Sequence, residues 1–297
     1  MRPPFDPAQY PPGTVVGGKY QLGSMIGFGE HSVVFAATHR FLQRKAAVKV
    51  FAQAAEAKQM ARIAREARLA GSLRHPNIVE IYEVGALPDH RPFLVMELLE
   101  GETLEQRVER VGPLPVAQAL AIAQQVLHGL AIAHEQKIVH RDLRPPNLFL
   151  ARVRGEEVCK ILDFGTARQF DNPQDTWTAP GTSLTHAAYF APEQLVVNAL
   201  VDHRADLYAT GMVLYVLLTG RVPFAAKAAA VLTEVMNAAP PPPSTWRPEL
   251  PRDVDRVVLA ALSKRPEDRF QTAEDMAEAL RLASLFADYV TGERTRE

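Results

Sequence analysis

The stretch His140-Arg141-Asp142-Leu143-Arg144-Pro145-Pro146-Asn147 decides the fold, together with the shorter stretch Asp163-Phe164-Gly165 downstream. Asp142, Asn147 and Asp163 each lie next to a segment with strand-like composition. Carboxylate and amide oxygens are the ligands that Mg²⁺ prefers, and a carboxylate can also accept a proton as a general base. Asp and Asn serve in turns and helix caps as well, but several specific residues in two motifs favour the chemical interpretation.

The segments before these motifs predict strands interrupted by one helix. Short β-branched or aromatic runs between turn residues are typical of strands, and a run rich in Ala, Glu, Arg and Leu is typical of a helix. The helix is expected over 54–72 and ends near Gly71, before the turn His75-Pro76-Asn77. The expected strands are Tyr20–Ile26, Val33–Thr38, Ala46–Phe51, Ile78–Val84 and Phe93–Glu97.

After Gly101 apolar residues recur at helical spacing. Helices are expected over 116–136, 203–219, 227–238, 252–262 and 272–288, with two short strands at Leu148–Ala151 and Val158–Leu162. The chain is therefore expected to be α+β, with a β-rich N-terminal part and a mostly helical C-terminal part.

Composition excludes several classes of protein. The 297 residues carry a formal net charge of −1, which argues against a general nucleic-acid or anionic-membrane binder. The single cysteine, Cys159, excludes an internal disulfide and fits a reducing, cytoplasmic setting. The most apolar stretch, Leu207–Thr219, is too short for a bilayer, so no membrane segment is expected. The proline-rich start predicts a flexible tail over 1–18.

Three further sequence features, a glycine-bearing hairpin, a lysine and a glutamate, indicate a function only when they are considered together. Gly27-Phe28-Gly29 lies between two expected strands rather than before a helix, a context that rejects a dinucleotide-binding fold. Its glycines suit a plain hairpin turn or a hairpin whose backbone approaches phosphate. Lys49 lies in an apolar strand, where its charge needs an anionic partner or an escape to solvent. Glu66 lies on the expected helix between Arg65 and Arg68, and alone it looks like any solvated position.

Taken in order, the motifs form a series. They are the glycine-bearing hairpin, Ala47-Val48-Lys49, Glu66, His75-Pro76-Asn77, the two stretches quoted first, Ala191-Pro192-Glu193, Asp206–Gly211 and Arg269. This series resembles the eukaryotic-type (Hanks-type) protein kinases over about residues 20–285. The proline-rich start and the ending Pro266–Phe270 are similar to bacterial Ser/Thr protein kinases.

The resemblance implies a protein-kinase-like two-lobe fold. Residues 19–97 would form an antiparallel β-sheet N-lobe with one main helix, 98–101 a hinge, 102–288 a mostly helical C-lobe, and 289–297 a C-terminal tail. It implies an enzyme that uses ATP and Mg²⁺ to phosphorylate Ser/Thr hydroxyls. Its partners would be ATP and protein substrates, with self-association as a route to autophosphorylation in trans.

The resemblance also implies roles for single residues. Asp142 would accept the substrate's hydroxyl proton, with Arg144 beside it in the catalytic loop. Lys49 would hold the α- and β-phosphates, oriented by an ion pair with Glu66. Asn147 and Asp163 would bind Mg²⁺, and Glu193 would pair with Arg269. The implied ATP-binding residues are Ile26, Gly27, Phe28, Gly29, Glu30, His31, Ser32, Val33, Val34, Ala47, Lys49, Met96, Glu97, Leu99 and Phe149.

The chain departs from the family pattern at three positions. Ser32 stands where the third glycine is usual, and Arg144 stands where the catalytic loop usually has Lys. His186 stands where a Thr usually precedes Ala-Pro-Glu, so Thr185 or Thr182 would replace that Thr, or the loop carries an insertion. Arg144 and His186 leave open the alternative of a pseudokinase that acts as a nucleotide-binding or scaffold module. A further alternative is a phosphotransferase acting on small molecules, against which Ala191-Pro192-Glu193 and Arg269 argue.

The polar stretch 165–190 suggests regulation by phosphorylation. It has no helix or strand periodicity and contains several hydroxyl residues. In related kinases the arginine before the catalytic Asp, here Arg141, belongs to a basic pocket for an activation-loop phosphate. Thr176 and Thr178 are the first candidates for autophosphorylation, and Thr182 is the next.

Overall fold

A computed structural model of the chain describes residues 5–29, 31–164, 187–224 and 230–291, with side chains described as far as residue 285. The chain forms two compact units. The first holds Met1–Arg74 and Ile78–Glu100, with Phe164 from a third stretch. The second holds His75–Asn77, Gly101–Asp163 and Pro173–Glu297.

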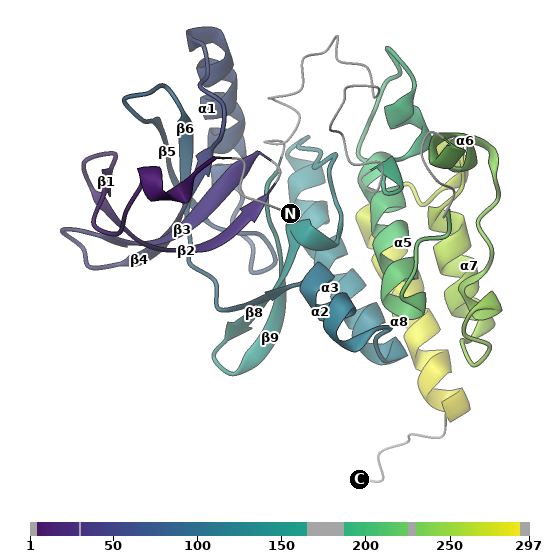
Figure 1. The fold of residues 1–297 in the computed structure, drawn as a ribbon. Helices are drawn as coiled ribbons and strands as arrows, with labels where there is room; N and C mark the ends of the chain where they lie inside the picture. The colour runs from purple at the N-terminus through teal and green to yellow at the C-terminus, as the bar shows by residue number, and fades with distance from the viewer. Residues whose placement is uncertain (1–4, 30, 165–186, 225–229, 292–297) are drawn as a thin grey trace. The chain divides into compact units, whose positions relative to one another are not determined.

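The first unit is built on a six-stranded antiparallel sheet with the order β1-β2-β3-β4-β6-β5 (Figure 1). Most of its strands follow one another through short turns, as the alternation of strand-forming runs and turn residues predicts. The strands are β1 (Val15–Val16), β2 (Tyr20–Gly29), β3 (Ser32–His39), β4 (Lys45–Phe51), β5 (Ile81–Ala86) and β6 (Pro92–Met96).

The sheet is covered by α1 (Ala57–Ser72), which contacts β5 and β6. Ile63, Ala67 and Ala70 are the buried residues of α1, and Ala67 packs with Phe51 and Leu94. A larger core cluster takes side chains from β2, β3, β4 and β6, among them the wholly buried Val33, Val48 and Val50. The sequence of β4 is almost entirely apolar because this central strand is buried on both of its faces.

The described part of the N-terminal segment, for which the prolines predict a flexible tail, forms a short turn and packs two aromatic side chains on the sheet unit. Pro7–Gln9 forms a 3₁₀ turn that Asp6 caps through a 2.9 Å hydrogen bond from the backbone of Ala8. Phe5 and Tyr10 pack against the larger core cluster, and Tyr10 donates a 3.0 Å hydrogen bond to Asp89. Burial of apolar surface by these two aromatic side chains opposes the entropic cost of ordering this short segment.

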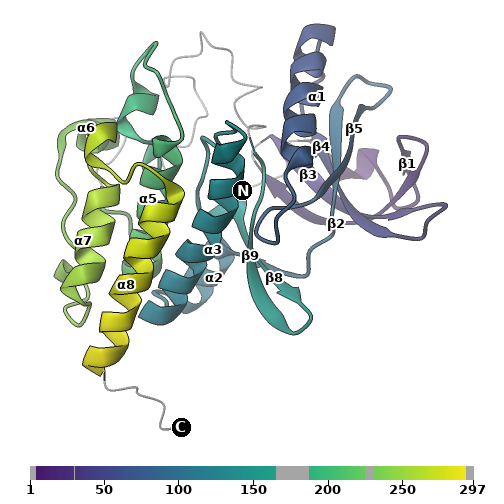
Figure 2. The same cartoon turned by 180° about the vertical axis from the view of Figure 1, so that it is seen from behind.

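The second unit combines helices with a small antiparallel sheet, β7-β8-β9 (Figures 1 and 2). Its strands are β7 (Gly101–Thr103), β8 (Leu148–Val153) and β9 (Glu156–Ile161). Its helices are α2 (Leu104–Val111), α3 (Val116–Glu135), α5 (Arg204–Thr219), α6 (Ala230–Asn237), α7 (Arg252–Ala261) and α8 (Ala273–Thr291). Short 3₁₀ turns lie at η2 (Pro145–Asn147), η4 (Pro192–Leu195), η5 (Pro243–Thr245) and η6 (Pro266–Asp268).

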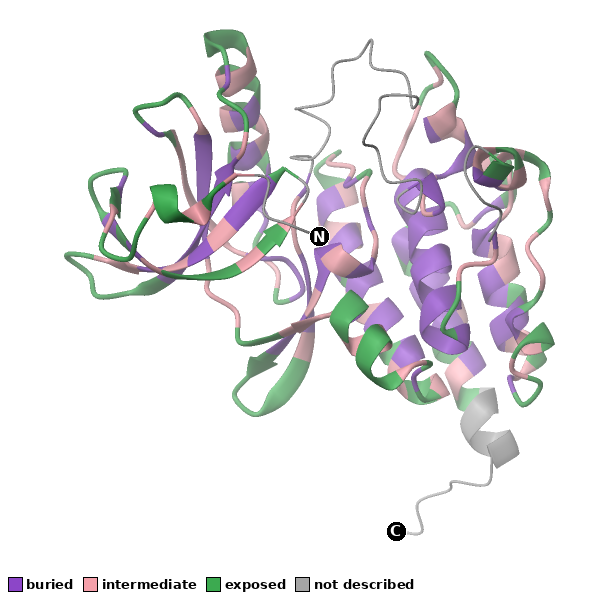
Figure 3. Cartoon of the chain, in the orientation of Figure 1, coloured by how far each residue is buried: buried purple, intermediate pink, exposed green. Residues whose placement is uncertain are grey.

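Helix α5 is the centre of the second unit. Every residue from Ala205 to Thr219 is buried, and the helix is purple along its length in Figure 3. A helix that is apolar on all sides must be surrounded by other elements, and α5 contacts α3 and α7. Gly211 makes the close approach to α7 possible, because a Cβ there would lie 2.8 Å from the Cβ of Ala261.

One helix of the described residues, α3, is long and apolar enough to cross a membrane by length and composition. Half of that apolar window is buried, and α3 packs against α5 and α8. Buried core helices pass the same test, so this is weak evidence for a membrane span.

The antiparallel sheet unit and the helical unit confirm the expected fold class. The sequence analysis missed β7 and α2, although α2 carries a recognisable signal. Thr103 and Gln106 form a capping box, in which each side chain bonds the other's backbone N–H. Helix α2 ends at Gly112, whose φ of 73° favours glycine.

Candidate active site

The backbone of the catalytic loop, residues 140–147, is fixed by Asp206 at the start of α5. Asp206 is fully buried and accepts 2.8 Å hydrogen bonds from the backbone N–H groups of His140 and Arg141. His134 Nε2 lies 2.8 Å from the same carboxylate. Burial raises the pKa of Asp206, but the His134 hydrogen bond, the electrostatic interactions with His134 and His140 and the backbone N–H of Arg141 outweigh it and hold the pKa below its ordinary value. The loop is therefore tied to a buried anion at two consecutive residues.

Asp142 is positioned by its neighbours within the loop. Asn147 donates from Nδ2 to the backbone oxygen of Asp142 at 2.7 Å and to its Oδ2 at 2.9 Å. Arg144 Nε lies 3.3 Å from Asp142 Oδ1, within ion-pair distance but without hydrogen-bond geometry. The side chain of Asp142 is 15% exposed. A carboxylate held at both oxygens and still open to solvent is suited to meet a substrate hydroxyl.

Asn147 and Asp163 are brought together by a backbone contact between their segments. Leu162 donates its N–H to the carbonyl of Asn147 at 2.9 Å, and the oxygen of Leu162 lies 2.6 Å from His140 Nε2. Asp163 follows directly, with a φ of 59° that is unusual for a residue other than glycine. Such backbone conformations cluster at functional sites.

The donor atoms at this place fit Mg²⁺ with a phosphate ligand. The two Nδ2 bonds of Asn147 leave its amide oxygen for a ligand, and Asp163 adds a carboxylate. Within the described ranges no group of three or more His, Cys, Asp or Glu could hold a metal. Two protein oxygens suit Mg²⁺, which is usually bound by one or two side chains plus phosphates and water.

In the first unit, Gly27 and Gly29 lie in the β2–β3 hairpin, where Gly29 pairs with Ser32. Neither glycine has the positive φ that would require it, and a Cβ on Gly27 would meet no atom within 4 Å. The hairpin itself therefore does not require glycine at Gly27, and the absence of a side chain there leaves space for close approach to the backbone. His31 is exposed, and Glu30 lies outside the described residues.

The side chain of Val33 faces the core, so the expected nucleotide contact of this residue, which stays a prediction, would be made by its backbone. Val33 is 0% exposed and belongs to the larger core cluster. Side chains alternate along a strand, so the partly exposed Val34, paired with Lys49, lies on the other face of β3. Only the backbone of Val33 remains for contact with a ligand.

Lys49 is 9% exposed, and its Nζ lies 5.4 Å from the centre of the Phe51 ring. Glu66 lies on α1 in the same unit and accepts a 3.2 Å hydrogen bond from Arg62. The ion pair between Lys49 and Glu66 stays a prediction.

The residues expected around adenine lie in both units. In the first, Ala47 and Met96 are cross-strand neighbours, 5% and 7% exposed. The backbone N–H of Glu97 donates to Glu80, and Glu97 Oε1 accepts from the N–H of Glu80, both at 2.9 Å. Ile26 and Phe28 are exposed on β2, and Leu99 is partly buried. Phe149, partly buried on β8, belongs to the second unit.

Glu193 and Arg269 are joined by two parallel 2.7 Å hydrogen bonds. Arg269 is 5% exposed and also donates to the backbone oxygens of Ser263, Arg204 and Lys264. A buried ion pair stabilises only when its remaining polar atoms are satisfied, as they are here. Next to Glu193, Gln194 donates to the backbone oxygen of Arg141 at 2.9 Å and so connects η4 to the catalytic loop.

Sequence reasoning missed three residues that position the loop: Asp206 as its anchor, His134 and Gln194. An acidic residue at the head of an apolar helix, as Asp206 is in the sequence, is a signal for a buried anchor. His134 and Gln194 carry no comparable signal. The phosphorylation candidates Thr176, Thr178 and Thr182 lie outside the described residues.

The chain combines an antiparallel sheet unit with a helical unit. Its loop 140–147 is anchored to Asp206 and holds Asp142, near two residues whose side-chain oxygens suit Mg²⁺, Asn147 and Asp163. These features are those of the protein kinase fold. A family model described as "Protein kinase domain" matches residues 20–280, and the chain belongs to this family.

Curated relatives agree with this assignment. The chain is 38% identical over 280 residues to a probable serine/threonine-protein kinase of Corynebacterium efficiens, which covers 91% of the chain and 42% of that protein. It is 36% identical over 274 residues to serine/threonine-protein kinase PrkC of Bacillus subtilis, covering 91% and 41%. It is 37% identical over 274 residues to serine/threonine-protein kinase PknB of Mycobacterium leprae, covering 90% and 43%. The chain thus spans about two fifths of the length of these relatives.

Proposed function

We propose that this chain is the catalytic domain of a protein serine/threonine kinase that transfers the γ-phosphate of ATP to protein hydroxyls. The observation that carries the proposal is the catalytic loop, in which Asp142 is held by Asn147 and Arg144 on a backbone anchored to Asp206. Relatives named as serine/threonine-protein kinases support the same reaction.

Asp142 orients the acceptor. Its carboxylate accepts the hydrogen bond of a Ser or Thr hydroxyl and directs the hydroxyl oxygen at the γ-phosphorus. The new bond forms between that oxygen and the γ-phosphorus, and the bond to the β–γ bridging oxygen breaks. The hydroxyl proton passes to Asp142, and ADP leaves. Arg144, whose guanidinium lies beside this carboxylate, adds positive charge next to the developing charge of the phosphoryl group.

Asn147 and Asp163 are the residues that would hold Mg²⁺ through their side-chain oxygens. The ion supplies neutralisation of the phosphate charge when it is bound. Ligand binding to the folded state raises the melting temperature, so ATP with Mg²⁺ should raise it more than ATP with a chelator. In Asp163→Ala this difference should disappear. A difference as large as in the wild type would remove Asp163 from the metal site.

Lys49 and the β2–β3 hairpin act on the nucleotide. The hairpin glycines allow backbone N–H groups to approach phosphate oxygens, and Lys49 adds a positive charge for the α- and β-phosphates. Ile26, Phe28, Ser32, Val34, Ala47 and Met96 supply apolar or small surfaces for the rest of the nucleotide. Phe149 is a separate candidate for contact with adenine. The backbones of Glu97 and Leu99 serve as hydrogen-bonding groups for the adenine edge.

The proposal includes autophosphorylation at Thr176, Thr178 or Thr182, with self-association as the route in trans. A phosphothreonine near Arg141 would form charge-assisted hydrogen bonds to its guanidinium. A domain that consumes ATP works where ATP is produced, so the proposal includes a cytoplasmic location. Mass spectrometry after incubation with ATP, with phosphatase-treated protein as reference, tests this part. No phosphate between Thr166 and Thr185 would contradict it.

A transfer assay with γ-labelled ATP separates the proposed reaction from its alternatives. Protein acceptors, Ser/Thr peptides and small-molecule alcohols are offered in parallel. Label on protein and peptide hydroxyls is expected. Nucleotide binding without transfer to any acceptor would favour the pseudokinase, and transfer to small molecules alone would favour the small-molecule phosphotransferase. The intact Lys49, Asp142, Asn147 and Asp163 give the pseudokinase no support.

A further inference from the structure

Helix α1 concentrates positive charge, although the whole chain has a net charge of −1. It contains four basic side chains and a single acidic one, Glu66. Its buried residues Ile63, Ala67 and Ala70 lie on one side. The opposite side is exposed (green on α1 in Figure 3) and is here named the basic face; it consists of Lys58, Ala61, Arg62, Arg65, Arg68, Leu69 and Ser72.

The basic face contains no acidic side chain. Arg62 pairs with Glu66 at the border of the face, at 3.2 Å. Within the part of the chain that the structure describes, Lys58, Arg65 and Arg68 form no ion pair. Other arginines do: Arg107, for example, bonds Glu102 and Glu157. The charges of Lys58, Arg65 and Arg68 are therefore not neutralised by ion pairs within the described residues, whereas that of Arg62 is paired.

The charges of α1 oppose its own stability. Its first turn contains Lys58 and no acidic residue, and the side chain of the N-cap, Glu56, makes no capping hydrogen bond. A positive charge at a helix N-terminus is unfavourable with the helix dipole. Lys58 and Arg62 are four residues apart, and Arg65 lies three from Arg62 and from Arg68, spacings at which like charges repel. A row of negative charges along this face would remove that repulsion.

We propose that the basic face of α1 binds an acidic segment of a partner protein. Charge complementarity requires the partner segment to place carboxylate side chains opposite Lys58, Arg65 and Arg68. From Lys58 to Arg68 the helix rises about 15 Å, which matches about five residues of an extended peptide. Leu69, 45% exposed within the face, offers contact for one apolar side chain of that segment.

The same face is poorly suited to a lipid surface. A helix that lies on a membrane inserts an apolar side, and the apolar side of α1 is buried in the first unit through Ile63, Ala67 and Ala70. Binding of an acidic peptide does not depend on catalysis, so it can be tested whether or not the domain transfers phosphate.

The experiment measures the fluorescence anisotropy of a labelled decaglutamate peptide with the full chain at low salt. The test variant is Lys58→Gln with Arg65→Gln and Arg68→Gln. The matched control changes three exposed basic residues of the second unit, Arg152→Gln, Arg154→Gln and Arg252→Gln. We expect the test variant to bind at least about tenfold more weakly and the control to stay within about twofold, and wild-type affinity to fall as salt rises.

Hydrogen exchange gives a second readout. The peptide should slow the exchange of the α1 amides in the wild type and not in the test variant, whose thermal unfolding shows whether it is folded. Equal loss of binding in the test and control variants would overturn the proposal. So would binding to vesicles of phosphatidylglycerol without binding to the peptide, and so would unchanged exchange in α1 at saturating peptide.

Discussion

Asp142 and Gly27 lie in segments that are built in opposite ways. The loop around Asp142 is tied to a buried carboxylate, to the end of β9 and to η4 by side-chain hydrogen bonds. The hairpin around Gly27 is held by the β2–β3 ladder, which is irregular between Leu22 and Gly27, and it has open space above its backbone. The loop around Asp142 is held by side-chain hydrogen bonds from several elements, whereas the hairpin has open space beside Gly27.

The difference matches what each segment has to do in the proposed reaction. A general base works only when it is held within a fraction of an ångström of the proton it accepts, and a buried hydrogen-bond network provides that precision. A cover over phosphates must admit and release a nucleotide, which a rigid buried network would prevent. Substitutions in the two segments should therefore act on different measured quantities.

The largest effect is expected for Asp142→Asn. The amide keeps the shape of the carboxylate but cannot accept the hydroxyl proton, so kcat should fall by about 10²–10⁴. The nucleotide Kd should stay within about twofold, because Asp142 faces the acceptor. Steady-state kinetics and nucleotide titration measure the two quantities.

The control for this substitution is Asp275→Asn on the exposed start of α8, which should leave kcat unchanged. A kcat equal to that of the wild type in Asp142→Asn would contradict the role of Asp142 as the base.

The two segments also differ in how well the sequence predicts them. The catalytic loop is specified by residue types with few other uses in such a pattern, so Asp142, Asn147 and Asp163 could be selected directly. The helix and strand positions followed from apolar periodicity and turn residues. The motif could not show that the side chain of Val33 faces the core, because which face of β3 a residue occupies depends on the register with β2 and β4.

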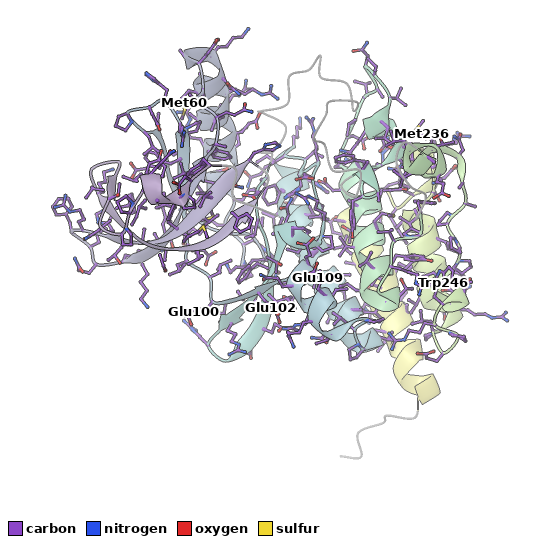
Figure 4. The ribbon with its side chains drawn as sticks, in the orientation of Figure 1. Met60, Glu100, Glu102, Glu109, Met236 and Trp246 are labelled. Carbon is purple, nitrogen blue, oxygen red and sulfur yellow. The ribbon has the colours of Figure 1, made fainter. Side chains whose placement is uncertain are left out.

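Other features depend on contacts between residues distant in sequence. Asp206 bonds the catalytic loop from α5, and Phe5 and Tyr10 pack on residues that follow much later in the chain. Composition favours a flexible tail at such a start, and the contacts of Phe5 and Tyr10 with the core could not be predicted from the local sequence. Helix α2 was not predicted, although its capping box is a local signal. Its many charged residues hide the helical spacing of its apolar residues. Figure 4 labels two of the charged residues in this region, Glu102 just before the helix and Glu109 on it.

The next effect in size is expected for Asp206→Asn. Removing the charge leaves His134 and two backbone N–H groups without their anionic acceptor, a loss of about 3 kcal/mol in the free energy of unfolding. Because the pKa of Asp206 is lowered in the folded state, its contribution is present above its ordinary pKa near 4 and is lost as the pH falls through the lower value. Urea unfolding from pH 7 to pH 3 should show the two proteins converging only in acid.

Asp202→Asn is the matched control, because Asp202 precedes α5 and pairs with Arg204 at an exposed position. It should cost about 1 kcal/mol or less. A stability difference for Asp206→Asn that is no larger than for this control would contradict the role of Asp206 as the anchor.

A smaller effect is expected from the coupling between Lys49→Met and Glu66→Gln. If the two residues act as one ion pair, the second substitution adds little once the first is made. A double-mutant cycle on kcat/KM should then give a coupling energy of about 0.5–3 kcal/mol. The control pair is Lys45→Met with Glu66→Gln, because Lys45 is an exposed residue at the start of the same strand. Additive losses in the Lys49 cycle would show that the pair does not form during catalysis.

The smallest effect on stability is expected for Gly27→Ala. The backbone of Gly27 has no positive φ, and the new Cβ would meet no atom within 4 Å, so the free energy of unfolding should change by no more than about 0.5 kcal/mol. The nucleotide Kd should nevertheless rise severalfold, because the methyl group occupies space that the phosphates would use.

Gly101→Ala is the contrasting case. The φ of Gly101 is 151°, and a Cβ there would lie 2.0 Å from the backbone oxygen of Leu150, so this change should destabilise the second unit by several times as much. Chemical unfolding and nucleotide titration of both variants measure the contrast. An unchanged Kd in Gly27→Ala would mean that the open space above the hairpin is not where the phosphates bind.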